Sequence, residues 1–105
     1  MINIKFDDKS VSDNEIVELS DSIQKIVSQI TKIQDVFVYA DSPRIKVKVA
    51  PIEIFVEMSA HKIADKDELT AKIKQALSEW KEVNNFNKPI NLSLIPMNWK
   101  VEIGI

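Results

Sequence analysis

The sequence predicts an α+β domain made of two βαβ repeats, with a mixed sheet and two helices packed on one of its faces. Two long stretches carry apolar residues at the three- and four-residue spacing of an amphipathic helix. Short stretches of alternating apolar and polar residues flank them, and the same order of elements occurs twice, about 50 residues apart. A chain of 105 residues, 45% of them hydrophobic, suits one packed domain and is too short for two. We therefore expect a single domain spanning residues 1–105.

The first repeat runs from residue 2 to residue 40. Residues 2–6 alternate in polarity, which indicates a half-buried strand. Ser12 and Glu15 form a capping box, a hydroxyl and a carboxylate three residues apart, at the start of a helix. Residues 36–40 are almost wholly apolar, which predicts a central strand. The apolar stripe of the helix consists of Ile16, Leu19, Ile23, Ile26, Ile30 and Ile33.

The second repeat follows a strand predicted over residues 44–49, where cations and β-branched residues alternate. Pro51 interrupts the ladder because proline has no amide hydrogen, and residues 52–58 form the next strand. Asp65 and Glu68 make a second capping box before a helix whose apolar stripe ends at Trp80. Residues 90–95 and 99–103 are the last predicted strands.

Composition excludes several classes of function. The chain has no cysteine, which removes disulfides, thiolate zinc sites and thiol nucleophiles. Its only glycine, Gly104, rules out the glycine-rich loops that bind phosphates and dinucleotides. A net charge of −2 argues against a nucleic-acid partner. No apolar run is long enough for a signal peptide or a membrane span, so we expect a cytoplasmic chain with no membrane partner, cofactor or metal.

The alternating cations of residues 44–49 have two interpretations. Arg44, Lys46 and Lys48 could form one anion-binding face, with Arg44 the best ligand because a guanidinium holds a carboxylate at two points. Alternatively, a tight reversal at residues 50–51 would place Lys48 opposite Glu53 and Arg44 opposite Glu57. Cross-strand pairs of this kind are common, and we favour them.

Two local motifs and the order of the elements resemble a known family. Residues 51–59, Pro-Ile-Glu-Ile-Phe-Val-Glu-Met-Ser, and residues 89–92, Pro-Ile-Asn-Leu, each begin a strand with proline. With an N-terminal strand and two long helices, this order is similar to that of the tautomerase superfamily. The larger members of that superfamily are the macrophage migration inhibitory factor group and related uncharacterised bacterial proteins.

The resemblance implies a homotrimer of βαββαβ subunits whose catalytic base is the amine of an N-terminal proline. This sequence departs from the pattern because residue 2 is Ile2, whose bulk should prevent removal of the initiator methionine. The primary amine of Met1 would then be the base. The resemblance also implies substrate-binding roles for Lys32 or Arg44 on an acidic keto substrate, for the backbone amide of Ala60, and for Asn91 in the pocket.

We therefore predict a tautomerase-like domain that lacks the usual proline-based keto–enol activity and binds a small carboxylate. The alternative is a ferredoxin-like module that binds a ligand or a protein without catalysis. The predicted strand 99–103 bears on this choice, since extra strands of tautomerase-like trimers pair with neighbouring subunits. On that ground the homotrimer is favoured.

Overall fold

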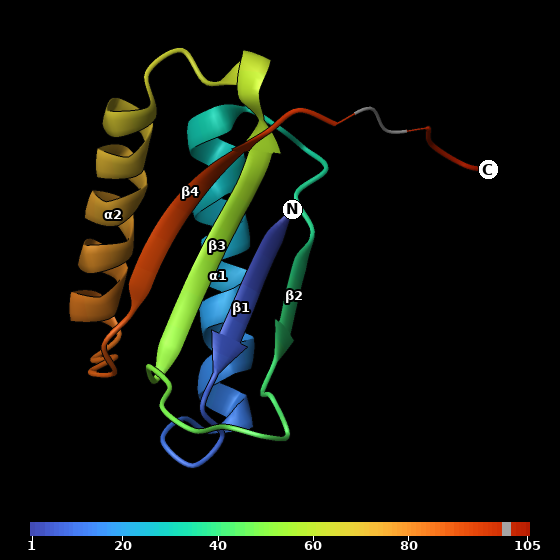
Figure 1. Cartoon of the computed structure of the whole chain (residues 1–105). Coiled ribbons are helices and arrows are strands. Elements are labelled where there is room, and N and C mark those ends of the chain that lie inside the picture. The colour runs from blue at the N-terminus through green and yellow to red at the C-terminus, as the bar shows by residue number, and fades with distance from the viewer. Residues whose placement is uncertain (100–101) are drawn as a thin grey trace.

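The computed structural model describes residues 1–99 and 102–105, which form one four-stranded sheet and two long helices (Figure 1). The sheet has the strand order β2-β1-β3-β4. In chain order the elements are β1 (Ile2–Phe6), α1 (Asp13–Thr31), β2 (Val38–Asp41), β3 (Ile52–Ser59), the short 3₁₀ helix η1 (Ala60–Lys62), α2 (Lys66–Val83) and β4 (Asn91–Met97).

Two βαβ units meet at the centre of the sheet. In each unit the two strands are parallel, β1 with β2 and β3 with β4, and a helix connects them. The units join through the antiparallel pairing of β1 with β3, in which Ile4 lies opposite Ile54. The predicted α+β fold of two βαβ repeats is confirmed.

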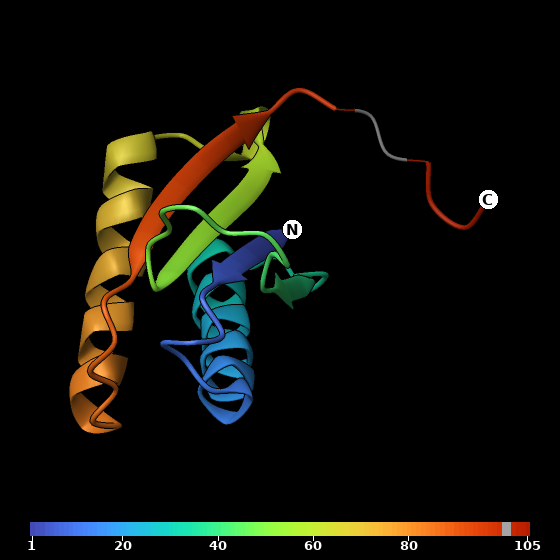
Figure 2. The same ribbon diagram turned by 60° about the horizontal axis from the view of Figure 1, so that its bottom comes forward.

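Both helices cover the same face of the sheet and leave the other face bare (Figure 2). The alternation of buried and more exposed residues along β1 and along β3 explains this arrangement, because every second residue of each strand points toward the helices. The core beneath the helices includes Ile2, Ile4, Ile52, Ile54, Leu19, Ile23 and Ile73, all fully buried. Burying a side chain of this size stabilises the fold by roughly 1.5–3 kcal/mol.

The first predicted capping box forms completely and the second only in part. Ser12 Oγ accepts a hydrogen bond from the Glu15 amide at 3.2 Å, and the Glu15 carboxylate accepts one from the Ser12 amide at 2.9 Å. The Ser12 amide lowers the pKa of Glu15. At α2, Asp65 accepts from the Glu68 amide at 3.0 Å, but the Glu68 carboxylate pairs with Lys72 instead of returning to the cap.

The prediction of a central strand over residues 36–40 is wrong in position. Strand β2 begins at Val38 and lies at the edge of the sheet, where Tyr39 is 56% exposed. Phe37, just before it, is also exposed. Residues 36–40 are apolar although no further strand among the described residues covers their outer edge. Their composition alone therefore did not determine their place in the sheet.

The strand predicted over residues 44–49 is also wrong, since none of these residues lies in a strand. Lys46 instead binds the turn between β1 and α1, with its Nζ 2.6 Å from Asp8 Oδ1 and 3.2 Å from Asp7 Oδ1. Strand β3 pairs with β1 and β4 instead, and the predicted pairs with Glu53 and Glu57 do not form. The Glu57 carboxylate accepts a hydrogen bond from the Asn3 side chain at 2.7 Å.

The predicted strand 99–103 falls partly outside the described residues, which omit 100 and 101. Trp99 and the residues from 102 onward are described and belong to no strand. Over the described ranges, no helix is both long and apolar enough to cross a membrane.

The turn that holds Lys46 predicts an acid-sensitive contribution to stability. The Lys9 amide, followed by Lys46 and Ser10, lowers the pKa of Asp7 from its usual 3.8. The ionised carboxylate therefore stabilises the fold at neutral pH, and this contribution is lost as the pH falls below about 4 toward the lowered pKa. Asp7→Asn should reduce the free energy of unfolding at pH 7 and flatten its decline in acid, measured by denaturant unfolding across pH. A free energy of unfolding that declines in acid as steeply in Asp7→Asn as in the parent would contradict this account.

Candidate functional site

The amino terminus extends the central pairing of the sheet by one residue. The Met1 amine donates a hydrogen bond to the Glu57 carbonyl at 2.9 Å, and the Glu57 amide donates one to the Met1 carbonyl at 2.8 Å. The next residue, Ile2, is fully buried, and its amide donates to the Phe37 carbonyl at 2.8 Å. These bonds fix the α-amine at the end of the sheet.

A cavity of about 160 Å³ lies beside Met1. Buried apolar side chains of α1, the α1–β2 connection and β3 form part of its wall, among them Val27, Val36 and Val56. Three further residues that line it are an aspartate, a lysine and a tryptophan: Asp35, Lys62 and Trp99. The cavity therefore combines an amine, a carboxylate and a second cation.

Burial changes the acidity of the Met1 amine. Partial loss of water around the ammonium lowers its pKa below the usual 8.0, and the negative charge of Glu57 opposes this by raising it. The net shift is downward, so a larger fraction of the amine is unprotonated at neutral pH than in a free chain end. An unprotonated amine can accept a proton from a bound compound.

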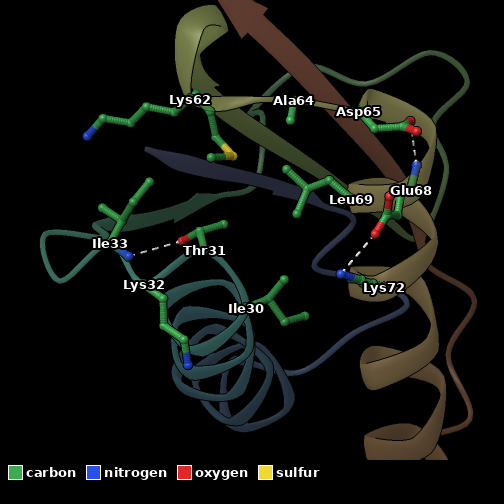
Figure 3. Close-up of a pocket in the computed structure, with 11 residues that line it drawn as sticks. Ile30, Thr31, Lys32, Ile33, Lys62, Ala64, Asp65, Glu68, Leu69 and Lys72 are labelled. Atoms are coloured by element: carbon green, nitrogen blue, oxygen red, sulfur yellow. Dashed lines mark hydrogen bonds and ion pairs between the residues drawn. The ribbon is translucent and has the colours of Figure 1, made fainter.

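A larger cavity of about 520 Å³ lies between the C-terminal end of α1 and the N-terminal end of α2 (Figure 3). It shares Ile33, Met58 and Lys62 with the Met1 cavity. Lys32, which lines only the larger cavity, ends α1 in a left-handed backbone conformation with φ 61°. Ile33 and Met58 thus separate Lys32 from Met1, whereas Lys62 faces both spaces.

The sheet topology divides the predicted site residues between its two ends. Met1 precedes β1, Lys32 ends α1 and Ala60 follows β3, so these three lie at one end (Figure 1). Arg44 follows β2, which runs parallel to β1, and Asn91 starts β4 opposite Glu53, so both lie at the other end. Glu53 and Glu57 are four residues apart on β3, which separates the two ends by about 13 Å.

Arg44 and Asn91 line cavities of their own. Arg44 borders one of about 460 Å³ with Asp8 and Lys46, on the segment that lies outside the sheet. Asn91 borders another of about 370 Å³ with Lys74 and Lys81 of α2. Within one chain, neither residue reaches the Met1 cavity.

Sequence reasoning missed Asp35, Lys62 and Trp99. Asp35 lies three residues after the predicted site residue Lys32, and Lys62 lies two residues after the predicted site residue Ala60. These short separations in sequence could have indicated that both residues belong to the site. Trp99 had none, because only the course of the chain after β4 brings its ring to Met1. The described residues contain no group of three His, Asp or Glu side chains that could hold a metal ion.

Comparison with solved structures identifies the fold. Malonate semialdehyde decarboxylase, solved as wild type, as a variant with its first-residue proline replaced by alanine and in inactivated form, matches all of this chain and 92% of its own, with TM-score 0.71 and 11% identity. The FG41 malonate semialdehyde decarboxylase inhibited by 3-bromopropiolate matches all of this chain and 91% of its own, with TM-score 0.69 and 13% identity. Native Ps01740 matches 96% of this chain and 98% of its own, with TM-score 0.63 and 15% identity.

This chain shares its backbone fold with these structures, which agrees with the fold that the resemblance to the tautomerase superfamily implies. No protein-family model matches the sequence, and no curated protein is significantly similar to it. The likeness therefore concerns the course of the backbone across nearly the whole chain. In this chain the start of β1 lies beside a cavity, and Met1 occupies that position.

The electrostatics of the Met1 cavity can be measured on the amine itself. Because the charge of Glu57 raises the pKa of the Met1 amine, Glu57→Gln should lower that pKa further. The pH dependence of the reaction of the amine with cyanate, followed by peptide mass, reports the pKa, and the intact mass shows whether Met1 is retained. Glu53→Gln, on the same strand at the other end, should leave the pKa unchanged. An upward shift in Glu57→Gln would contradict this account of the cavity.

Proposed function

We propose that this chain is a tautomerase-like domain that binds a small oxo-carboxylate beside Met1 and lacks the proline-based keto–enol activity. The observation that carries the proposal is the hydrogen-bonded primary amine of Met1 at a cavity where the fold begins its first strand. The cavity's cation and aromatic ring suit a carboxylate with a neighbouring carbonyl group.

The lack of proline-based activity follows from the geometry of the nitrogen. A proline ring locks the rotation of its nitrogen about the backbone and gives its lone pair one direction. Met1 has no such ring, so only the hydrogen bond from its amine to the Glu57 carbonyl orients the nitrogen, and the Met1 residue is 49% exposed. Proton transfer depends steeply on orientation, so we expect the primary amine to be a much weaker catalyst.

The substrate carboxylate would contact a cation near the amine. Lys62 lines the Met1 cavity directly, and Lys32 supplies a second ammonium in the adjoining space. Ala60 lies at the same end of the sheet and could contribute its backbone amide. These groups would orient the carbonyl of the bound compound toward Met1.

Arg44 and Asn91 can serve this cavity only from another copy of the chain, which supports a homotrimer as the working assembly. The edge of β2 has no strand beside it among the described residues. Apolar side chains are also exposed there and in the following segment: Phe37, Tyr39, Ile45, Val47 and Val49. Exposed apolar side chains beside an open strand edge are typical of surfaces that pair with another chain.

A non-catalytic binding module remains the second candidate. It is favoured by the bond from the Met1 amine to Glu57, which engages the amine in the sheet. In such a module the cavity would hold a carboxylate without proton transfer.

The proposed lack of proline-based activity can be tested by inserting one proline between Met1 and Ile2. Proline is small enough for the initiator methionine to be removed, so the new proline amine would occupy the place of Met1. Insertion is better than Ile2→Pro because Ile2 is fully buried and its amide binds Phe37. We expect enol–keto conversion of an aryl pyruvate to rise at least about 100-fold over the parent.

An alanine inserted at the same place is the matched control, because it also releases the methionine but leaves a primary amine. Its rate should stay near that of the parent. A parent already as fast as the proline variant would contradict the proposed lack of activity. If the parent and the proline variant both match buffer, the Met1 cavity is not a latent tautomerase site.

The assembly predicts a solution mass three times the 12.0 kDa of one chain, measured by light scattering on a sizing column. Val47→Lys should convert the trimer to a monomer, because Val47 is 99% exposed in one chain and contributes nothing to its core. Lys48→Gln, at the neighbouring exposed position, should remain trimeric. A monomeric parent would favour the binding module and remove the proposed roles of Arg44 and Asn91.

A further inference from the structure

We propose that the cavity between the ends of α1 and α2 is a separate binding site for a medium-chain carboxylate. Its hydrocarbon chain would lie on the apolar wall, and its carboxylate would sit at the rim, which Lys32 and Lys62 line. Figure 3 draws both ammonium groups directed away from the space between Ile30 and Leu69, so the two side chains would have to turn toward the ligand. This inference goes beyond the proposed function: it shares Lys32 and Lys62 with the carboxylate contact proposed there, but it does not depend on the amine of Met1.

The wall of the cavity is suited to a hydrocarbon chain. Ile30 projects into it from α1 and Leu69 from α2, so the two helices face each other across an apolar space (Figure 3). Ile33 and the buried Met58 complete the apolar lining. The volume of about 520 Å³ falls within the range of sites that hold small organic molecules.

The charges around the cavity leave a surplus of cations. Glu68 pairs with Lys72 at 3.0 Å on the α2 wall, and Asp65 accepts the Glu68 amide at 3.0 Å as the cap of the helix. Both acids therefore already have partners. Lys32 and Lys62 form no ion pair within the described part of the chain, and they lie on either side of Ile33, across the cavity from α2 (Figure 3).

Lys32 also occupies a position that its backbone does not favour. Its φ of 61° and ψ of 18° are left-handed values, which glycine adopts without the steric cost that a side chain brings. A lysine there costs the helix end some stability, and its residue lines the cavity. Lys32→Gly should therefore weaken ligand binding without destabilising the fold, because glycine removes the cation and adopts the left-handed conformation without steric cost.

The hydrocarbon chain is required because exposed lysines hold a lone carboxylate weakly. Each buried methylene adds to the affinity through the hydrophobic effect, so affinity should rise with chain length. A ligand without the charge would lose the contacts with the two lysines. The site therefore selects for both parts of the molecule.

The test is a titration of the full chain with octanoate, followed by two-dimensional amide NMR. Shifts should concentrate at residues 30–33 and 58–72, and octanoate should bind at least about tenfold more tightly than acetate or octanol. Equal binding of acetate would overturn the role of the apolar wall, and equal binding of octanol would overturn the role of the lysines. The proline-inserted chain should bind octanoate as the parent does, so this inference can fail or succeed independently of the proposed activity.

Two variants locate the carboxylate. Lys62→Gln and Lys32→Gly should each weaken octanoate binding at least about fivefold. The Tm of Lys32→Gly should not fall below that of the parent, so its loss of binding cannot be assigned to unfolding. Lys66→Gln makes the same charge change as Lys62→Gln on an exposed residue outside the cavity lining, and it should bind normally. An equal loss in Lys66→Gln would mean that only the overall charge attracts the ligand.

Discussion

The antiparallel pairing of β1 with β3 is the constraint on which the rest of the structure depends. It joins two βαβ units, each of which has an apolar sheet face and a helix to cover it. With Ile4 opposite Ile54, the buried faces of the two units form one surface, and both helices pack on the same side. A shift of one residue in this pairing would turn the isoleucines of one unit toward solvent. The same pairing carries Met1 to Glu57, so the position of the terminal amine is a consequence of how the core is built.

The pairing also gives the sheet two ends with different chemistry. At one end β1 starts, β3 stops and α1 finishes, which gathers an amine and several lysines around two adjoining cavities. At the other end lie the turn that holds Lys46 and the beginning of β4. The resemblance in sequence assigns Arg44 and Asn91 to the same pocket as Met1, but the structure places them at the other end of the sheet. Only a second chain could bring them to the Met1 cavity. Ligand binding and assembly are in this way linked in the proposed function.

Much of the fold could be predicted from the sequence because its signals are local. The capping residues Ser12 and Asp65 and the apolar stripes specify both helices from a few neighbouring positions. The errors came from apolar patterns that predict burial without indicating which element causes it. Residues 36–40 are apolar but lie at the open edge of the sheet, and residues 44–49 alternate in polarity but pair with no strand in the described part of the same chain. The position of Met1 could be predicted because Met1 directly precedes the first strand. The position of Trp99 beside the Met1 cavity could not, because it depends on the path of the chain after β4. Lys46 shows the same limit, since its two carboxylate partners lie 38 and 39 residues away.

The two hydrogen bonds between Met1 and Glu57 give the processing of the chain end a direct effect on the cavity. An acetyl group on that nitrogen would turn the amine into an amide and remove its positive charge. An affinity tag placed before Met1 would do the same and would also have to leave the molecule past Lys62 and Trp99. The charge beside this cavity thus depends on whether Met1 keeps a free amine. Recombinant protein for any assay should accordingly carry its tag at the other terminus.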